Sequence, residues 1–591
     1  MRLFLLTAAT TLFFLTNNLK AQRASGTNKQ LDSLFNSYYD EGLKLSPGMA
    51  TYYGDHRYND LLPAEFTDNY RGNYNEYYSR YLKALSKFKR EGLSENDRLS
   101  YDIFKWQLEM SLEGLTQKDN RIPFDQFGGI PLYIAQFGSG TVVQPFKIIK
   151  DYNDWIKRAT AFSVWADSAI VYFRKGMEEG FVVPKALVEK MIPQMNSFVT
   201  TDVAKSVFYG PITNLPNSFS DSEKVQLTKS YVRLINEQLI PTYKKMRDFL
   251  QVEYLPKART TSGLDAVPEG ASLYNYNVRL ITTTHVTADE LYKTGLAEVK
   301  RIRGEMEKIK ESFGFKGDLQ AFLEYIRIDP KFFPYKNPDE VLAAYRVIQK
   351  KIDPQLHNLF LHIPKTPFEI RQTESFRAAS AAAQYVGGLP DGSRPGIFYV
   401  PIVDAVKTPI ASESLFAHEA IPGHHYQIML QYENDRLPQF RRHGEFTAFV
   451  EGWGLYSESL GKELGLYTDP YQKMANLSDE IHRAIRLVVD PGLHTKGWTR
   501  EQAIKYMTDN EPISEQKATA EIERYMAIPG QAVAYKVGQM KLQALRNKYT
   551  KQLGSAFNIA AFHDEILKDG AMPLDILEKK LDAWANKQTK K

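Results

Sequence analysis

The chain contains no cysteine among its 591 residues, so it can form no disulfide bond. It also lacks a concentrated basic region, because 75 basic and 70 acidic residues are spread along its length. This distribution argues against nucleic acid as a partner. Beyond the N-terminal segment no apolar run approaches the eighteen residues of a membrane span. Neither a fixed-period repeat nor a Gly/Ser-rich or Pro-rich linker divides the chain, which predicts a single large domain.

The N-terminus has the pattern of a signal peptide. Met1-Arg2 supplies a positive start, and Leu3–Leu15 is an apolar run too short for a comfortable membrane span. Cleavage after Ala21 would remove residues 1–21. No cysteine follows that could carry a lipid, so we expect no membrane anchor after cleavage. A periplasmic or secreted protein is therefore predicted, and the sequence indicates no oligomeric state.

Helical signals dominate the remainder of the chain. Apolar and aromatic residues recur at helical spacing, and 35 Tyr and 33 Phe suit thick aromatic packing between helices. Thr287-Ala-Asp-Glu290 and Asn337-Pro-Asp-Glu340 are helix-start sequences. We predict a mostly α fold: residues 22–591 form one large helical domain, with an N-terminal helical half at about 28–370 and a metal-site half at about 371–591.

Three segments interrupt this pattern. Arg121–Thr141 and Arg259–Tyr276 are rich in Gly and Pro, and we predict surface loops there, the first reaching toward a cleft. Ile397–Ile402 is β-branched and aromatic between turn signals, which predicts a short strand. As an edge beside the histidine cluster it could hold an extended peptide by backbone hydrogen bonds, although an ordinary edge strand is equally expected. Tyr399 on this strand is a candidate substrate-binding residue.

Three of the 11 histidines fall within eight residues around a glutamate, in the run His418-Glu-Ala-Ile-Pro-Gly-His-His425. A His-Glu pair followed by another His on a helix is the usual way to hold zinc beside a general base. Here the spacing is longer than usual and contains Pro422-Gly423. We therefore predict a zinc site with His418 as one ligand and Glu419 as the base.

The second histidine ligand is ambiguous. At about 100° per residue, a seven-residue step on a helix returns to nearly the same face, which favours His425 over His424. However, Pro422-Gly423 is expected to distort the helix, which weakens this argument. His425 is the first choice and His424 the alternative.

A third ligand is expected from the next helical stretch. Glu451 lies among Phe449, Val450 and Trp453, where a carboxylate must be compensated by a partner such as a metal ion. Glu445 and Glu458 lie nearer the ends of this stretch and are expected on solvated faces. A purely structural role for Glu451 is the alternative.

Further polar residues follow downstream. Arg486 and His494 are candidate substrate-binding residues, and Arg486 shares a helical face with His482 and Asp490 that is either a cleft lining or a surface salt-bridge face. Tyr535 is either a core residue or a donor to a developing oxyanion. An exopeptidase needs a charged clamp for the peptide terminus, and the candidates are Arg377, Arg394, Arg483 and Arg486.

With these residues in view, the chain resembles the bacterial family known as domain of unknown function 885 (DUF885). The resemblance covers roughly residues 375–545. Its motifs are Asp391-Gly-Ser-Arg-Pro-Gly396, His418-Glu-Ala-Ile-Pro-Gly-His-His425, Val450-Glu-Gly-Trp-Gly-Leu-Tyr456, Arg486-Leu-Val-Val-Asp-Pro-Gly-Leu-His494 and Pro529-Gly-Gln-Ala-Val-Ala-Tyr535.

That family in turn looks like a relative of gluzincin-type zinc peptidases, such as angiotensin-converting enzyme and the Taq-type carboxypeptidases. The resemblance implies a helical fold with a deep cleft and a short β-edge beside the zinc helix. It also implies Zn²⁺ held by His418, a second histidine and Glu451, with Glu419 as base and Tyr535 as oxyanion donor. The run after His425 matches the run after the second ligand in such enzymes, which again favours His425.

The sequence therefore predicts a zinc metallopeptidase, a carboxypeptidase or an oligopeptidase, that hydrolyses short peptides. Two alternatives remain. One is a metal-dependent peptide-binding protein without turnover, and the other is a zinc amidase that acts on cell-wall peptides.

Overall fold

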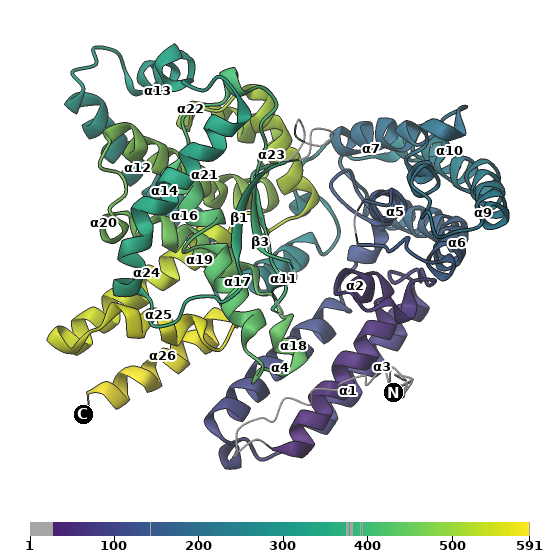
Figure 1. The fold of residues 1–591 in the computed structure, drawn as a ribbon, viewed down its shortest axis with the longest axis horizontal. Coiled ribbons are helices and arrows are strands. Elements are labelled where there is room, and N and C mark those ends of the chain that lie inside the picture. The colour runs from purple at the N-terminus through teal and green to yellow at the C-terminus, as the bar shows by residue number, and fades with distance from the viewer. Residues whose placement is uncertain are drawn as a thin grey trace, which may run out of the picture.

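A computed structural model describes residues 28–589, apart from residues 142, 374–377, 379–381, 391 and 393. The predicted signal peptide and Arg377 lie outside the described residues. Helix accounts for 70% of the structure and the described strands form one small sheet, which confirms the mostly α prediction (Figure 1). None of the described helices combines the length and apolar character that a bilayer span requires.

The helices follow the chain in this order. The N-terminal group comprises α1 (Lys29–Leu45), α2 (Pro47–Tyr52), α3 (Asp68–Leu85), α4 (Glu95–Gly114), α5 (Ile130–Gly138), α6 (Ile149–Glu179), α7 (Lys185–Ser197), α8 (Gly210–Thr213), α9 (Asp221–Leu234), α10 (Ile240–Phe249), α11 (Gly270–Thr282), α12 (Ala288–Ser312), α13 (Leu319–Ile328) and α14 (Pro338–Leu359). After the sheet come α16 (Glu413–Glu419), α17 (His424–Glu433), α18 (Gln439–Arg442), α19 (Thr447–Glu458), α20 (Gly461–Leu464), α21 (Pro470–Thr495), α22 (Arg500–Asn510), α23 (Glu515–Ala527), α24 (Ala534–Leu553), α25 (Ile559–Leu567) and α26 (Leu574–Gln588).

Three hydrophobic cores hold these helices together. The first joins α1, α3 and α4 to α14, the sheet and the C-terminal helices. The second joins α6, α7, α9 and α10, which lie to the right in Figure 1, to α12, α13 and α21–α23. A smaller core surrounds α11. Each core draws on residues from both sides of residue 370, so the two halves of the chain are packed into one domain.

Local capping explains where several helices begin. The predicted capping box at Thr287 is present: its hydroxyl accepts from the Glu290 N–H, and the Glu290 carboxylate accepts from the Thr287 N–H. The Asn337 side chain likewise caps α14. The two predicted loops are partly helical, because α5 lies inside Arg121–Thr141 and α11 begins inside Arg259–Tyr276.

The sheet contains β1 (Phe368–Gln372), β2 (Gln384–Val386) and β3 (Gly396–Val400) in the order β1-β3-β2. The strand predicted at Ile397–Ile402 is present as β3, and it ends before Pro401, which cannot donate to the ladder. It is the central strand rather than an edge, since β1 pairs with it in parallel and β2 in antiparallel orientation. The edge near the histidine cluster is β2.

Candidate metal centre

Three side chains from separate elements converge in the interior. His418 is the penultimate residue of α16, His424 begins α17, and Glu451 lies on α19. Their potential ligand atoms all lie within 4.8 Å of one another. The Glu451 Oε2 is 3.5 Å from His418 Nε2 and 3.8 Å from His424 Nε2. Ligands of tetrahedral zinc lie roughly 3.3 Å apart when each bond is about 2 Å, so small movements would close this site around an ion.

A break in the helix brings the two histidines together. The chain leaves helical geometry at Ala420 and resumes it at His424. At Gly423 the backbone turns back onto α16 so closely that a Cβ would lie 1.8 Å from the His418 carbonyl oxygen. Only glycine fits there. As a result the two imidazole rings lie 4.8 Å apart and nearly perpendicular, although six residues separate them in the chain.

The ring of His418 is cradled by one face of α19. Glu451 and Glu458 are seven residues apart, so they share that face. His418 Nε2 faces Glu451, while its Nδ1 lies 2.7 Å from Glu458 Oε1. Between the two carboxylates, a Cβ at Gly454 would come within 2.6 Å of the ring. The pattern Glu-x-x-Gly-x-x-x-Glu from Glu451 to Glu458 therefore leaves space for a histidine ring between two carboxylates. Sequence reasoning missed this pattern.

Glu458 was expected on a solvated face, but its side chain is only 3% exposed. One carboxylate oxygen bonds His418, and the other accepts from the Ser414 hydroxyl at 2.9 Å. Ser414 is held in turn by Asn476 of α21. Such a carboxylate fixes the tautomer and orientation of a metal-binding histidine, leaving Nε2 free for the ion.

We expect Glu458→Gln to lower zinc affinity by about 10–100-fold, because it removes the charge that orients and polarises His418. Competition with a fluorescent zinc chelator measures the change. Glu515→Gln, at an exposed position at the start of α23, is the control and should leave affinity unaltered. Equal affinity of the Glu458 variant and the parent protein would contradict this role.

The side chain of His425 contacts the sheet residues Tyr385 and Phe368 instead of the cluster. Its Nδ1 lies 2.8 Å from the Tyr385 hydroxyl, and its ring packs against Phe368 at 5.0 Å between centroids. The geometry thus favours His424, not His425, as the second histidine of the cluster. The argument from an unbroken helix pointed to His425, and it fails because α16 and α17 are separate helices with different axes.

Glu419 lies beside the cluster. It follows His418 directly, and its Oε2 accepts the backbone N–H of Tyr385 on β2 at 3.0 Å. The side chain is half-buried. One oxygen is therefore anchored to the sheet edge, and the carboxylate is held in a defined position next to the histidines.

The electrostatics of the cluster favour a positive charge at its centre. Burial opposes a charge on His418, but its bonds to Glu451 and Glu458 prevail and raise the pKa of His418 to about 10. Burial also opposes the charge on Glu451, yet the neighbouring His418 and His424 lower the pKa of Glu451 to about 2. A proton is thus held between two carboxylates where no metal ion is present. A dication bound by the same atoms would likewise compensate the negative charge of the buried carboxylates, so the donor set fits zinc.

Tyr535 lies near this centre because two helices approach very closely. The backbones of α19 and α24 touch at Gly452 and Gly538, where a Cβ on Gly538 would lie 1.9 Å from the Ala448 carbonyl oxygen. Tyr535 is one turn from this contact and Glu451 is adjacent to it. Burial raises the pKa of Tyr535, and the charge of Glu451 raises it further.

The guanidinium group of Arg486 packs against the ring of Tyr535. Its guanidinium lies 4.6 Å from the centroid of the Tyr535 ring. The Nε donates to the Tyr525 hydroxyl at 2.9 Å, and Nη2 pairs with Glu521 at 3.2 Å. Arg486 is buried, so this arrangement indicates a positioning residue for Tyr535 more than a substrate contact.

The other predicted substrate contacts lie apart from the cluster. His494 is fully buried, with Nδ1 accepting from the Leu264 N–H and Nε2 donating to the Tyr525 carbonyl, which indicates a structural role. Phe398 packs on Phe416 of α16, so Tyr399, the next residue, points to the opposite face of the sheet.

Two of the proposed clamp arginines are also engaged by the protein itself. Arg394 is exposed and donates to the Gly387 carbonyl. Arg483 donates to the Asp479 carbonyl and lies 4.0 Å from Glu458. Neither placement identifies a clamp for a peptide terminus.

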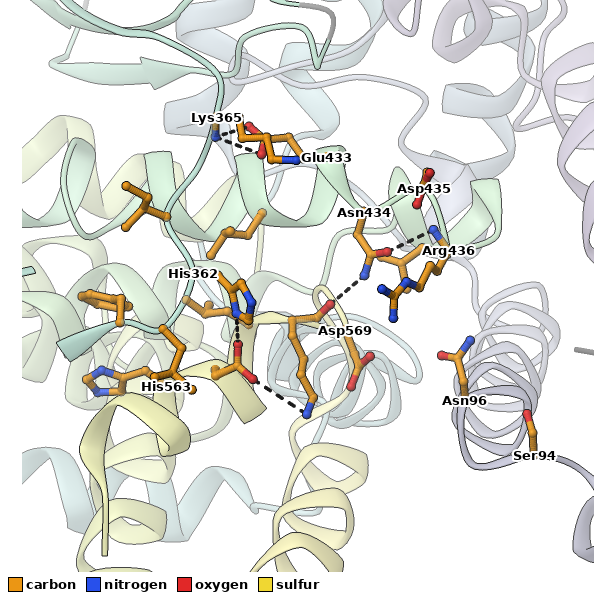
Figure 2. Close-up of a pocket in the computed structure, with 18 residues that line it drawn as sticks. Ser94, Asn96, His362, Lys365, Glu433, Asn434, Asp435, Arg436, His563 and Asp569 are labelled. Atoms are coloured by element: carbon orange, nitrogen blue, oxygen red, sulfur yellow. Dashed lines mark hydrogen bonds and ion pairs between the residues drawn. The ribbon is translucent and has the colours of Figure 1, made fainter. Parts of the chain in front are cut away.

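A cavity of about 700 Å³ lies at the far end of α17 (Figure 2). Its lining includes Glu433, which is roughly 14 Å along the helix axis from His424. Two of its titratable side chains are paired with protein groups in Figure 2: Glu433 accepts the backbone N–H of Lys365, and His362 pairs with Asp564 at 2.6 Å. The cavity does not include the metal cluster.

Comparison with known proteins supports the fold and assigns no activity. The family model described as "Bacterial protein of unknown function (DUF885)" matches residues 47–581. One similar solved structure is titled a "putative lipoprotein from Colwellia psychrerythraea"; it is 27% identical, has a TM-score of 0.85, and the match covers 94% of this chain and 99% of that one. Another is a "putative lipoprotein of unknown function from Shewanella oneidensis", 20% identical with a TM-score of 0.72, covering 93% and 99%. No curated protein matches the chain.

Proposed function

Because this chain belongs to the bacterial DUF885 family, whose description gives no function, we propose one from its own site: zinc-dependent hydrolysis of peptide bonds in short peptides or oligopeptides. We place this activity in the periplasm or outside the cell, on the basis of the N-terminal signal pattern.

A single observation carries the proposal. Two histidines and one glutamate converge in the interior, and a second glutamate, Glu419, follows the first histidine without joining the cluster. Structural zinc sites are closed by four protein ligands, whereas catalytic sites use three and keep one position open. Glu451 retains 22% exposure of its side chain, so the cluster can be reached from solvent. This donor set is also the one that the resemblance to gluzincin-type peptidases implies.

The residues divide the chemistry between them. When bound, zinc would polarise the scissile carbonyl and make a water molecule more acidic. Glu419 would accept the proton of the attacking water and then transfer it to the leaving amine. Tyr535, packed on Arg486, would donate its hydroxyl hydrogen to the oxyanion that develops on the carbonyl oxygen.

The direct test is to incubate the zinc-loaded protein with a mixed peptide library and locate cleavage positions by mass spectrometry. We expect one equivalent of zinc per chain and cleavage that stops when a chelator removes the metal. Cleavage confined to muropeptides added to the library would point to an amidase of cell-wall peptides. Peptide binding without cleavage would contradict catalysis and leave a binding protein.

A further inference from the structure

A second cavity, of about 400 Å³, lies where α11 meets the segments before α5, before α7 and after α23. Its volume falls within the range of about 300–1,000 Å³ that is typical of small-molecule sites. Most of its lining is apolar, and the larger side chains include Phe181, Leu187, Leu273, Leu280, Met526 and Ile528. The surface that it offers to a ligand is therefore hydrophobic.

The charged residues of this lining are occupied by other parts of the protein. Asp125 accepts two backbone N–H groups of its own turn, at 2.7 and 2.9 Å. Arg259 donates from Nε and Nη1 to two backbone carbonyls, at 2.9 and 2.6 Å. Asp119 pairs with Arg71 at 2.9 Å. The cavity thus favours an uncharged, apolar occupant.

The cavity is connected to the proposed catalytic residues. Gln531 lines it and lies four residues before Tyr535 in the chain, and its side-chain oxygen accepts from Arg524 at 2.7 Å. The intervening loop is fixed in place: Asn277 donates to the Pro529 carbonyl at 3.2 Å, and the Gly530 N–H donates to Asp490 at 3.1 Å.

Helix α11 contacts both the cavity and the two helices that carry Glu451 and Tyr535. Leu273, Asn277, Leu280 and Ile281 all line the cavity and lie on one face of this helix. The same helix packs against α19 and α24, which carry Glu451 and Tyr535. An apolar cavity is thereby placed one helix away from the metal cluster.

We propose that this cavity receives a large apolar or aromatic side chain of the peptide, about three residues from the bond that is cut, because a helix about 10 Å wide lies between the cavity and the cluster. The inference rests on the proposed peptidase function and adds a substrate class to it: peptides with Phe, Leu or a similar residue about three residues from the scissile bond. Full burial of such a side chain predicts a preference of about 10–100-fold in kcat/KM over glycine at that position.

Filling the cavity tests the proposal. Ala527 lines it at the end of α23, so Ala527→Phe should reduce kcat/KM for a Phe-containing peptide by about 10-fold or more. The same variant should leave a matched Gly-containing peptide unaffected. Ala520→Phe, at an exposed position of the same helix, is the control and should retain the preference. Leu280→Ala enlarges the cavity and should shift the preference from Phe toward Trp. A preference that survives in Ala527→Phe, or one for charged residues in the parent protein, would overturn the proposal.

Binding separates failure of the pocket from failure of the peptidase function. N-acetyl-L-phenylalaninamide, followed by saturation-transfer NMR on the full-length protein, should bind the parent and Ala520→Phe more strongly than Ala527→Phe. N-acetylglycinamide should show no such difference. If no peptide is cut but this pattern holds, the peptidase function fails and the apolar pocket stands. Equal signals from the two Phe variants would reject the pocket whether or not peptides are cut.

Discussion

Replacing Glu419 by glutamine is expected to lower kcat for peptide hydrolysis by about 10²–10⁴-fold, the usual contribution of a positioned general base. Glutamine keeps the shape of the side chain, and its amide oxygen can still accept the Tyr385 N–H that anchors Glu419 to β2. It cannot accept a proton from water at neutral pH. Because Glu419 lies outside the three-residue cluster, zinc content should stay at the level of the parent protein.

Two measurements make this result specific. Zinc per chain, determined by mass spectrometry of the metal, distinguishes a lost base from a lost ligand. Single-turnover kinetics with a peptide chosen from the library isolate the chemical step from product release. Undiminished hydrolysis would remove Glu419 from the mechanism, and loss of zinc would make it a ligand instead. Glu515→Gln, which changes an exposed carboxylate at the start of α23, should leave both values unchanged.

Local signals account for what the sequence predicted well. A helix start depends on groups three residues apart, so Thr287 and Glu290 identify the beginning of α12 from the sequence alone. The apolar run that became β3 is likewise a local pattern. The concentration of histidines around Glu419 pointed to the cluster of His418, His424 and Glu451, although no regular motif was present.

The features that the sequence did not predict depend on contacts between distant segments. Glu458 was expected in solvent because it ends its helix, yet α16 and α21 cover it and make it the partner of His418. β3 is the central strand because β1 and β2 pair with its two sides, and the residues of β3 alone do not reveal that pairing. Neither arrangement has a signature in its own segment.

The glycine-rich segments illustrate the same limit. Arg121–Thr141 and Arg259–Tyr276 were interpreted as loops, and both contain helices. Asp125 and Leu264 from these segments nevertheless line the apolar cavity beside α11. Composition therefore located the breaks in helical structure but could not show that they meet at one cavity.

The adjacent residues His424 and His425 provide the sharpest test of the metal centre. His424→Ala should lower zinc affinity by more than about 100-fold, beyond the usual effect of a residue that only supports a ligand. His425→Ala should keep one zinc per chain, because its ring bonds Tyr385 and lies outside the cluster. It should instead lower stability by about 1–3 kcal/mol, since the Tyr385 hydroxyl loses a partly buried partner.

Chelator competition and thermal unfolding of both variants, with and without zinc, measure the two effects. In the parent protein zinc should raise the melting temperature, because an ion that binds only the folded chain stabilises it. That increase should persist in His425→Ala and disappear in His424→Ala. The reverse pattern would restore the unbroken-helix argument and would require the chain to straighten at Gly423. In the present turn a Cβ on Gly423 would clash with the His418 carbonyl oxygen, so the glycine that permits the break between α16 and α17 is also what brings His424 to the cluster.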